Sequence, residues 1–373
     1  MIKLVHLSND SKFLDCAIEQ YNLLNNVFSI YLVESSLPHL KYVKSSNISI
    51  MKNIDEVVDF IKNSGCDFVV VHGLFFSLSK LQLVNKPFIW CSWGFDIYSD
   101  SSSYFHKLIS LPLYKPLTKK FIVGNTPMSV GQKILKYCKA LITRYRYYKF
   151  INTKVKYIST VFPEEYQFIQ KSVKGVGFYP FRYMNVRNDK IEVKNDIGGE
   201  CILLGNSCDE TNNHMDVLEK LELLQKEIKV IMPISYPENR LAYKKMLRQY
   251  VEKLKYVKVI LLDDFMPYEE YCKLISKCSF AIFGHIRQQA AGNITQMLRM
   301  GAKVFMYKDS MGYQHYTNLG CKVFSIDDDL NAEQLSQLIS DNDAKKNLSI
   351  INPVNGRLRY MNNLQLFFDS LGA

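Results

Sequence analysis

The chain has 373 residues, of which 47% are hydrophobic and 22% charged, and its formal net charge at pH 7 is +11. This composition excludes an intrinsically disordered or fibrous chain, and the length suits two domains of ordinary size. The longest stretch without a charged residue, 20–33, is too short to cross the ~30 Å hydrocarbon layer of a bilayer.

Strands and helices are predicted to alternate along the first half of the chain. Apolar runs predict strands over 2–7, 28–33, 68–72 and 87–91, and helical spacing predicts helices over 12–24 and 54–63. This succession implies right-handed crossovers and a parallel sheet. Ligands bind such sheets at the carboxyl ends of the strands, which makes His72 and the turn Trp93-Gly94-Phe95-Asp96 candidate site residues.

The next region is strongly basic. Residues 101–163 contain twelve lysines and arginines, many tyrosines and no acidic residue. Such a mixture suits the surface of an anionic membrane, but it also suits nucleic acid, and a solvated pair of basic helices is the plain alternative. We expect this region to dock the first domain on a membrane through Lys115, Lys119, Lys120, Lys133 and Lys136.

The second half repeats the alternation of strands and helices. Strands are predicted over 201–205, 229–234, 257–262, 280–283 and 304–306, each followed by a polar loop or a helix. The fold class is therefore α/β, with two doubly wound domains at 1–183 and 200–373 and a polar linker at 184–199. The net charge, +12 over residues 1–195 and −1 over 196–373, changes near the same boundary. A helix expected over 355–371 could cross back to the first domain.

The most informative segment is 280–306. An apolar strand ends at Gly284, a polar turn carries Arg287, Gln288 and Gln289, and a helix with Asn293 in its first turn follows. Free backbone N–H groups at a helix N-terminus bind anions, and a guanidinium adds a planar cation suited to phosphate. The alternative is a buried turn whose arginine pairs with a carboxylate elsewhere in the fold.

Other chemistry has weaker support in the sequence. No histidine has a ligand-spaced partner and no Asp-x-Asp lies in a strand-end loop, so we expect no metal and no cofactor. The nine cysteines are scattered and form no C-x-x-C pair, which suggests reduced thiols in a cytoplasmic protein. Residues 1–6 lead directly into a predicted strand and lack a signal-peptide pattern.

The polar loops together match a known family. The set Gly205-Asn-Ser-x-Asp-x-x-Asn-x-His214, Pro233-x-x-Tyr-Pro-x-Asn239, Arg287-Gln-Gln289, Trp93-Gly-x-Asp96 and His72-Gly73 resembles the bacterial TDP-N-acetylfucosamine:lipid II N-acetylfucosaminyltransferases. The resemblance runs in order through about residues 68–310. The chain departs from the family in two places: the segment 101–175 is longer and more basic than expected, and Cys91 stands where a histidine is expected.

This resemblance implies a GT-B glycosyltransferase, in which two Rossmann-like domains face each other across a cleft. Such an enzyme moves an aminodeoxy sugar from a nucleotide diphosphate, dTDP in this family, to a polyprenyl-diphosphate-linked saccharide. The implied partners are the nucleotide-sugar donor, the lipid-linked acceptor and an anionic membrane surface, with no nucleic acid. The implied location is peripheral, on the cytoplasmic face of the bacterial inner membrane.

Chemistry suggests roles for the loop residues of the second half. Diphosphate charge builds on the leaving group during glycosyl transfer, and without a metal it must be held by cations and N–H groups. Arg287 is the expected clamp. The other residues expected to contact the nucleotide-sugar donor lie in the polar loops after the strands of the second half. They are Gly205, Asn206, Ser207, Asp209, His214, Tyr236, Gln288, Gln289 and Asn293. Tyr236 and Phe265 could flank the base, although a rim tyrosine and a core phenylalanine are the plain alternatives.

In the first half, the acceptor hydroxyl needs a hydrogen-bond acceptor or base. Asp96 is the expected base, although it could instead cap the helix that follows it. His72 is the alternative base, although it could instead be a core histidine. Trp93 and Gly94 would hold the acceptor sugar, and Arg182 is assigned to the same side. Two other classes stay open, namely a nucleotide-sugar epimerase of the same fold and a nucleic-acid-binding protein.

Overall fold

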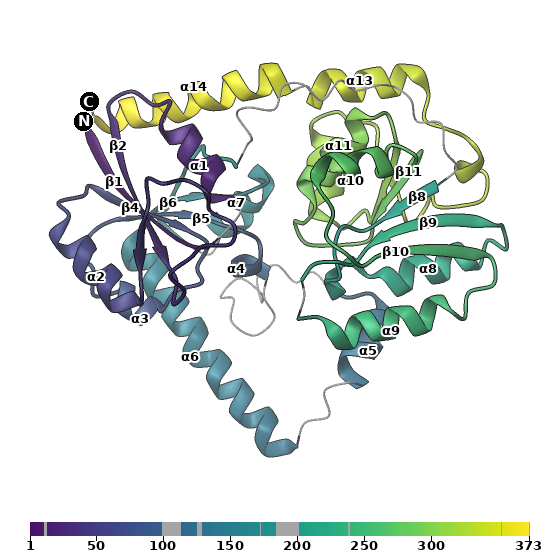
Figure 1. The fold of residues 1–373 in the computed structure, drawn as a ribbon, viewed down its shortest axis with the longest axis horizontal. Helices are drawn as coiled ribbons and strands as arrows, with labels where there is room; N and C mark the ends of the chain where they lie inside the picture. Colours follow the sequence, from purple (N-terminus) through teal and green to yellow (C-terminus); the bar gives the residue numbers. More distant parts are fainter. Residues whose placement is uncertain are drawn as a thin grey trace. The chain divides into compact units, whose positions relative to one another are not determined.

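The computed structural model describes residues 1–10, 13–98, 113–124, 129–171, 173–183, 201–237, 239–351 and 353–372. These residues form two compact units. Unit 1 holds residues 1–98, 129–183 and 353–372 of the described chain, and unit 2 holds 113–124 and 201–351. Each unit is built on one parallel sheet (Figure 1).

The sheet of unit 1 has the strand order β3-β2-β1-β4-β5-β6-β7, and every recorded pairing is parallel. Valines, isoleucines and leucines make its central strands buried on both faces, as crossover helices require. Its strands are β1 (Ile2–Asn9), β2 (Val27–Glu34), β3 (Ser49–Met51), β4 (Phe68–His72), β5 (Phe88–Cys91), β6 (Val155–Ser159) and β7 (Gly177–Phe178). Its helices are α1 (Leu14–Tyr21), α2 (Ile54–Asn63), α3 (Leu78–Leu81), α4 (Phe95–Tyr98), α6 (Val130–Lys154), α7 (Pro163–Gln170) and α14 (Pro353–Gly372).

The sheet of unit 2 has the order β10-β9-β8-β11-β12-β13, again parallel throughout. The order reverses between β8 and β11, which is the switch point where ligands bind in open α/β sheets. The strands are β8 (Cys201–Leu204), β9 (Ile228–Pro233), β10 (Val257–Leu262), β11 (Phe280–Phe283), β12 (Lys303–Met306) and β13 (Phe324–Ser325). The helices are α5 (Pro116–Gly124), α8 (His214–Glu222), α9 (Leu241–Val251), α10 (Tyr268–Ile275), α11 (Ala291–Arg299), α12 (Met311–Asn318) and α13 (Asp341–Ile351), with short 3-10 turns η1 (Glu210–Asn212) and η2 (Gln334–Ser336).

Two helices lie in a different unit from the one that their sequence position suggests. Helix α5, expected in the first domain, packs on α8 of unit 2, where Asp216 accepts hydrogen bonds from the backbone N–H of Leu117 (2.8 Å) and the hydroxyl of Thr118 (2.7 Å). Helix α14 packs in unit 1, because Leu364 and Phe368 are buried in its core (Figure 1). The domain bounds 1–183 and 200–373 are therefore corrected at α5, whereas α14 makes the crossing to the first domain that was considered for the C-terminal helix. The linker 184–199 lies outside the described residues.

Among the described helices, none combines the length and apolar character needed to cross a membrane.

Candidate functional site

The candidate site lies where the loops after β8 and β11 meet, at the switch point of the sheet of unit 2. Glycine is required in both loops. Gly205 has a φ of +68°, and a Cβ there would lie 2.8 Å from Nε2 of His214. A Cβ at Gly284 would collide with the carbonyl oxygen of Asn212. The backbone N–H of Gly205 also donates to the carbonyl of Ile282 on β11 (2.9 Å), so the two loops are held together.

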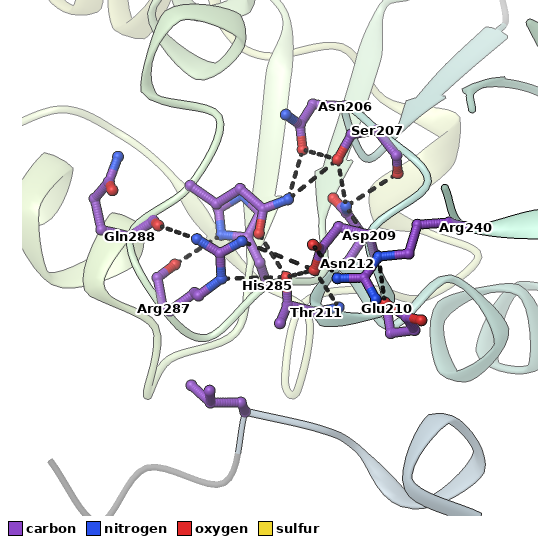
Figure 2. Close-up of polar contacts among 12 residues, drawn as sticks. Asn206, Ser207, Asp209, Glu210, Thr211, Asn212, Arg240, His285, Arg287 and Gln288 are labelled. Atoms are coloured by element: carbon purple, nitrogen blue, oxygen red, sulfur yellow. Dashed lines mark hydrogen bonds and ion pairs between the residues drawn. The ribbon is translucent and has the colours of Figure 1, made fainter. Parts of the chain in front are cut away.

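Arg287 is the central cation of this site. Its Nε donates to the hydroxyl of Thr211 (3.3 Å), and its Nη1 donates to the carbonyl of Gln288 (3.2 Å). Its Nη2 lies 3.8 Å from Oδ1 of Asp209, and 16% of the side chain remains exposed. These contacts orient the guanidinium (Figure 2), and its exposed part is accessible to a ligand.

Asp209 lies between two arginines. Arg240 reaches it from the side opposite Arg287, with its Nη2 3.7 Å from Oδ2 of Asp209 and its Nε 3.4 Å from Glu210 (Figure 2). Burial alone would raise the pKa of Asp209, but the Arg287 guanidinium, two hydrogen bonds from Thr211 and Arg240 together lower it below its ordinary value. Asp209 is therefore an ionised carboxylate that positions both guanidinium groups.

Gln289 connects the two loops through its amide. Its Oε1 lies 2.7 Å from Oγ1 of Thr211, and its Nε2 donates to Oδ1 of Asn206 (3.0 Å) and to Oγ of Ser207 (3.4 Å). Asn206 and Ser207 are thus joined through Gln289 to the loop that carries Arg287, and their contact with the donor stays a prediction. All three side chains hold the loops in place, because they satisfy one another.

The N-terminus of α11 follows Arg287 directly. Its N-cap residue, Ala290, has a φ of 56° and makes no side-chain cap, so the N-cap side chain leaves the first-turn N–H groups uncovered. This is the anion-binding arrangement predicted for the turn. Gln288 is nearly buried in the same turn. Asn293 instead accepts from the hydroxyl of Tyr271 on α10 (3.2 Å), and so it braces α11 against its neighbour.

The structure places His214 differently from the sequence prediction. His214 is fully buried, its Nδ1 lies 3.2 Å from the hydroxyl of Tyr243, and Asn213 occupies the cap position of α8. Burial lowers the pKa of His214 to about 3, which makes it a neutral core residue. His214 was predicted to contact the donor, but its side chain lies inside the fold, close enough to Gly205 that a Cβ there would lie 2.8 Å from Nε2 of the imidazole.

Two aromatic side chains lie exposed near the carboxyl ends of neighbouring strands. Tyr236, after β9, is 61% exposed, and Phe265, after β10, is 86% exposed. The carbonyl of Tyr236 accepts from the backbone N–H of Cys208 (2.6 Å), which ties the loop after β9 to the loop after β8. At 86% exposure, Phe265 is a surface side chain of this loop and not part of the core. The core alternative for Phe265 is wrong.

In unit 1 the structure corrects the role expected of Asp96. The residue is fully buried, and its carboxylate accepts from the indole of Trp90 (2.7 Å) and from the backbone N–H groups of Trp93 (3.0 Å) and Leu74 (3.2 Å). Burial raises its pKa to about 6, although these hydrogen bonds oppose the shift. Asp96 thus holds together the turns after β4 and β5, and its carboxylate is buried among protein donors and not exposed to an acceptor.

His72 belongs to a buried chain of hydrogen bonds. Its Nε2 lies 3.0 Å from Nδ1 of His6, whose Nε2 lies 3.2 Å from Oγ of Ser29. Its Nδ1 lies 2.6 Å from the hydroxyl of Tyr183, which also accepts from the indole of Trp93 (2.7 Å). Burial lowers the pKa of His72 to about 3, so the imidazole is neutral and only weakly basic. His72 is connected to Trp93 through one phenol.

Trp93 and Gly94 form the turn at the end of β5. Gly94 has a φ of +82° and directly precedes α4. Its carbonyl accepts a hydrogen bond from the backbone N–H of Tyr98 at the end of that helix (2.8 Å). Trp93 meets Phe13 and Phe75 edge to face, with ring centroids 5.5 Å and 5.3 Å away. Both phenylalanines are partly exposed, so an aromatic surface lies at the carboxyl edge of this sheet.

The remaining predicted residues are divided between the units. Arg182 donates to the hydroxyl of Tyr360 on α14 (3.1 Å) and is a structural contact of unit 1. Lys115 stands in unit 2 with its ammonium 4.0 Å from the ring centre of Tyr307 and 3.6 Å from Asp309, which removes it from a membrane-facing role. Lys119 and Lys120 are exposed on α5 of the same unit. Lys133 and Lys136 lie on α6 of unit 1, and their side chains lie outside the described part of the chain.

Sequence reasoning missed several residues that build the site. Thr211 joins Asp209, Gln289 and Arg287, and Asn213 ties the first loop to the carbonyl of Gly284 (2.7 Å). Arg240 supplies the second guanidinium. Thr211 and Asn213 lie inside the matched loop motif, so the polar run after β8 was the available signal. Nothing in the sequence marked Arg240.

Among the described residues, no three His, Cys, Asp or Glu side chains are grouped so as to hold a metal ion. Metal independence stays a prediction.

Comparison with known proteins identifies the family. Residues 142–353, more than half of the chain, match the model of the 4-alpha-L-fucosyltransferase family, glycosyl transferase group 56. The chain belongs to this family. It is therefore an enzyme, a glycosyltransferase of the fucosyltransferase type.

Solved structures confirm the fold over the whole chain. The N-terminal domain of Candida albicans trehalose-6-phosphate phosphatase is similar with a TM-score of 0.63 at 9% identity, covering 99% of this chain and 96% of that one. Sucrose-phosphate synthase from Thermosynechococcus elongatus gives 0.60 at 8% identity, with 100% and 99% covered. Anabaena HepE in complex with UDP-glucose gives 0.53 at 10% identity, with 98% and 94% covered. The fold is GT-B, with two Rossmann-like domains, as the sequence predicted.

Proposed function

We propose that this fucosyltransferase moves an acetamidodeoxy sugar such as N-acetylfucosamine from dTDP to a polyprenyl-diphosphate-linked saccharide. The transfer would take place at the cytoplasmic face of a bacterial membrane and serve the synthesis of surface polysaccharide. The observation that carries the donor half of the proposal is Arg287, which is oriented by three partners beside the uncapped N-terminus of α11. The dTDP and acceptor assignments rest on the resemblance of the loop motifs described above.

The chemistry of the site suits a diphosphate leaving group. As the glycosidic bond to the donor breaks, negative charge grows on the diphosphate and positive charge grows on the sugar. Arg287 and the N–H groups of α11 would bind the growing negative charge. Arg240 would add a second cation from the opposite side of Asp209. Two guanidinium groups and a helix N-terminus can neutralise a diphosphate without a metal ion, and we propose that they do so.

The exposed aromatic residues suit the base of the nucleotide. Tyr236 and Phe265 follow β9 and β10, which are adjacent in the sheet of unit 2. A planar base placed on either ring would bury apolar surface that the protein leaves exposed. Anabaena HepE was solved with UDP and with UDP-glucose, so a GT-B protein of this overall similarity binds a pyrimidine nucleotide. We infer that the base lies at this end of the sheet.

The aromatic surface of unit 1 suits the acceptor saccharide. Trp93, Phe13 and Phe75 present ring faces and edges at the carboxyl edge of the first sheet, where sugar rings pack well. Since Asp96 is buried among protein donors, we propose that the acceptor hydroxyl is bound near the Tyr183 hydroxyl, which connects Trp93 to His72.

A panel of nucleotide sugars tests this proposal. A ligand present at a hundred times its Kd stabilises the folded state by about 2.7 kcal/mol, so dTDP-sugars should raise the Tm clearly. We expect dTDP-linked acetamidodeoxy sugars to raise it more than UDP-glucose or GDP-fucose, and Arg287→Ala to remove the shift. Transfer of the labelled sugar to a polyprenyl-diphosphate disaccharide is the confirming assay. A larger shift and faster transfer with another nucleotide would overturn the donor assignment.

A further inference from the structure

Helix α6 (Val130–Lys154) of unit 1 is the longest helix of the described chain, and only its second half packs against the sheet. Tyr147, Phe150 and Ile151 are buried in that half. The first half extends away from the sheet of unit 1 (Figure 1). A capping box at Ser129 and Gln132 closes its N-terminus, so the extension is a properly ended helix.

The first half of α6 carries a stripe of exposed apolar side chains. Val130, Ile134, Tyr137, Leu141 and Tyr145 follow one another at helical spacing and are between 44% and 73% exposed. We call these five residues the α6 stripe. At 1.5 Å per residue it is about 23 Å long. Soluble proteins rarely leave so much aliphatic and aromatic surface uncovered in one place, so the stripe is expected to have an occupant.

Every charged residue of α6 is basic. Over its 25 residues the helix carries Lys133, Lys136, Lys139, Arg144, Arg146, Lys149 and Lys154 and no acidic residue. By helical periodicity, positions 139, 144 and 146 fall outside the arc that the stripe occupies. Leu135 and Ile142 are also exposed and widen the apolar face on the side of the stripe, and the basic residues occupy the rest of the helix surface. This is the pattern of helices that lie flat in the surface of an anionic bilayer.

We propose that the α6 stripe inserts into the interfacial layer of an anionic lipid membrane, with the basic side chains of the helix bound to headgroups. This proposal rests on the proposed function, because a lipid-linked acceptor is met at that surface. It replaces the expected dock of five lysines, one of which, Lys115, is paired within unit 2. In this arrangement the apolar side chains of the stripe make the central contact with the membrane, and the basic side chains beside them bind the anionic headgroups.

The same features argue against other occupants. A second copy of α6 would bring two exclusively basic helices together, and like charges at close range oppose association. Nucleic acid would engage the basic residues but would leave the valine, isoleucine and leucine of the stripe exposed to water. An anionic bilayer satisfies both faces of the helix at once.

Sedimentation with lipid vesicles tests the proposal without any sugar substrate. The stripe variant is Ile134→Gln with Leu141→Gln, because glutamine keeps helix propensity while removing apolar surface. The matched control is Leu366→Gln, which replaces an exposed leucine on α14 of the same unit. A third variant, Lys139→Glu with Arg146→Glu, reverses two charges. Far-UV circular dichroism and the Tm must agree among all four proteins before they are compared.

We expect the wild type and Leu366→Gln to bind vesicles rich in phosphatidylglycerol equally well. The stripe variant should bind roughly ten to a hundred times more weakly at every salt concentration, since two buried aliphatic side chains are lost. The charge variant should lose binding mainly at low salt, because screening already weakens headgroup contacts at high salt. Equal binding by the stripe variant and Leu366→Gln would overturn the proposal. The proposal would also be overturned if the wild type were a dimer in solution and the stripe variant a monomer, since the stripe would then join two copies of the chain.

Parallel transfer assays separate this inference from the proposed function. The stripe variant should lose transfer to a long-chain lipid acceptor but keep transfer to a short, water-soluble analogue. Wild-type protein that binds vesicles and transfers to neither acceptor would disprove the proposed function and support the dock. Wild-type protein that transfers to both acceptors without binding vesicles would disprove the dock and support the function.

Discussion

Replacing Arg287 by alanine should nearly abolish transfer while leaving the fold intact. The guanidinium lies 3.8 Å from the carboxylate of Asp209, and a unit charge at that distance interacts with it by about 4 kcal/mol at an effective dielectric constant of about 20. A donor phosphate at a similar distance would gain a comparable amount. Only the charge that develops during bond breaking favours the transition state, so we expect a loss of about 3 kcal/mol, roughly a hundredfold in kcat/KM.

The stability of the variant should change much less than its activity. Asp209 keeps Arg240 at 3.7 Å and its hydrogen bonds from Thr211, so it does not become an isolated buried charge. We expect the free energy of unfolding to fall by about 1 kcal/mol, as for the loss of an ordinary hydrogen-bonded contact. Urea unfolding and initial rates at a fixed acceptor concentration measure the two quantities on the same preparation.

Two further variants sharpen the test. Arg287→Lys keeps the charge but loses the planar fork, so it should recover only part of the rate. Arg248→Ala removes another partly exposed arginine of unit 2, whose partner is Asp263, and should leave transfer unchanged. Near-normal turnover and donor affinity in Arg287→Ala would refute the assignment of the diphosphate clamp.

Three other outcomes follow from the structure. Transfer should persist in excess EDTA, and an activity that EDTA removes and Mg²⁺ or Mn²⁺ restores would show that the diphosphate is held by a metal. Asp96→Asn should lower the free energy of unfolding by about 2–4 kcal/mol, because the new amide nitrogen would face a buried N–H donor. If the variant instead kept its Tm and lost transfer, Asp96 would be the catalytic base after all. Burial raises the pKa of Glu165 to about 7 from 4.5, so its protonated form is favoured in the folded state. The protonated Glu165 therefore adds up to about 3 kcal/mol to the free energy of unfolding below pH 4.5, and this stabilisation is lost as the pH rises through about 7. In urea unfolding at a series of pH values, Glu165→Gln should make the free energy of unfolding depend less on pH.

Periodicity in the sequence was sufficient to predict most of the fold. The strands later seen as β1, β4, β5, β8, β9 and β11 are apolar runs bounded by polar turns, and runs of this kind are a local property of the chain. The strand β6 was not predicted, and neither were the short edge strands β3, β7 and β13, whose two or three residues carry no periodicity. The placement of α5 in unit 2 was also missed, since it depends on Asp216 and Asn213, which lie almost a hundred residues away.

The candidate site was predicted unevenly for a physical reason. Arg287, Asp209, Asn206 and Gln289 were found because polar residues at the carboxyl ends of parallel strands converge at one edge of the sheet. Burial decided the other cases. Asp96 and His214 stand at equally suggestive positions, but their side chains turn inward and bind the protein itself, and no motif indicates that direction.

The route of the chain through its two units has a consequence for synthesis on the ribosome. The aromatic core around Tyr21 and Tyr179 in unit 1 is completed by Leu364 and Phe368 of α14, which are translated only after the strands and helices of unit 2. At about 5–20 residues per second, that core would wait roughly ten to forty seconds for its last helix. During this interval unit 1 would expose an apolar groove, so nascent chains should depend on holding chaperones until translation passes α14.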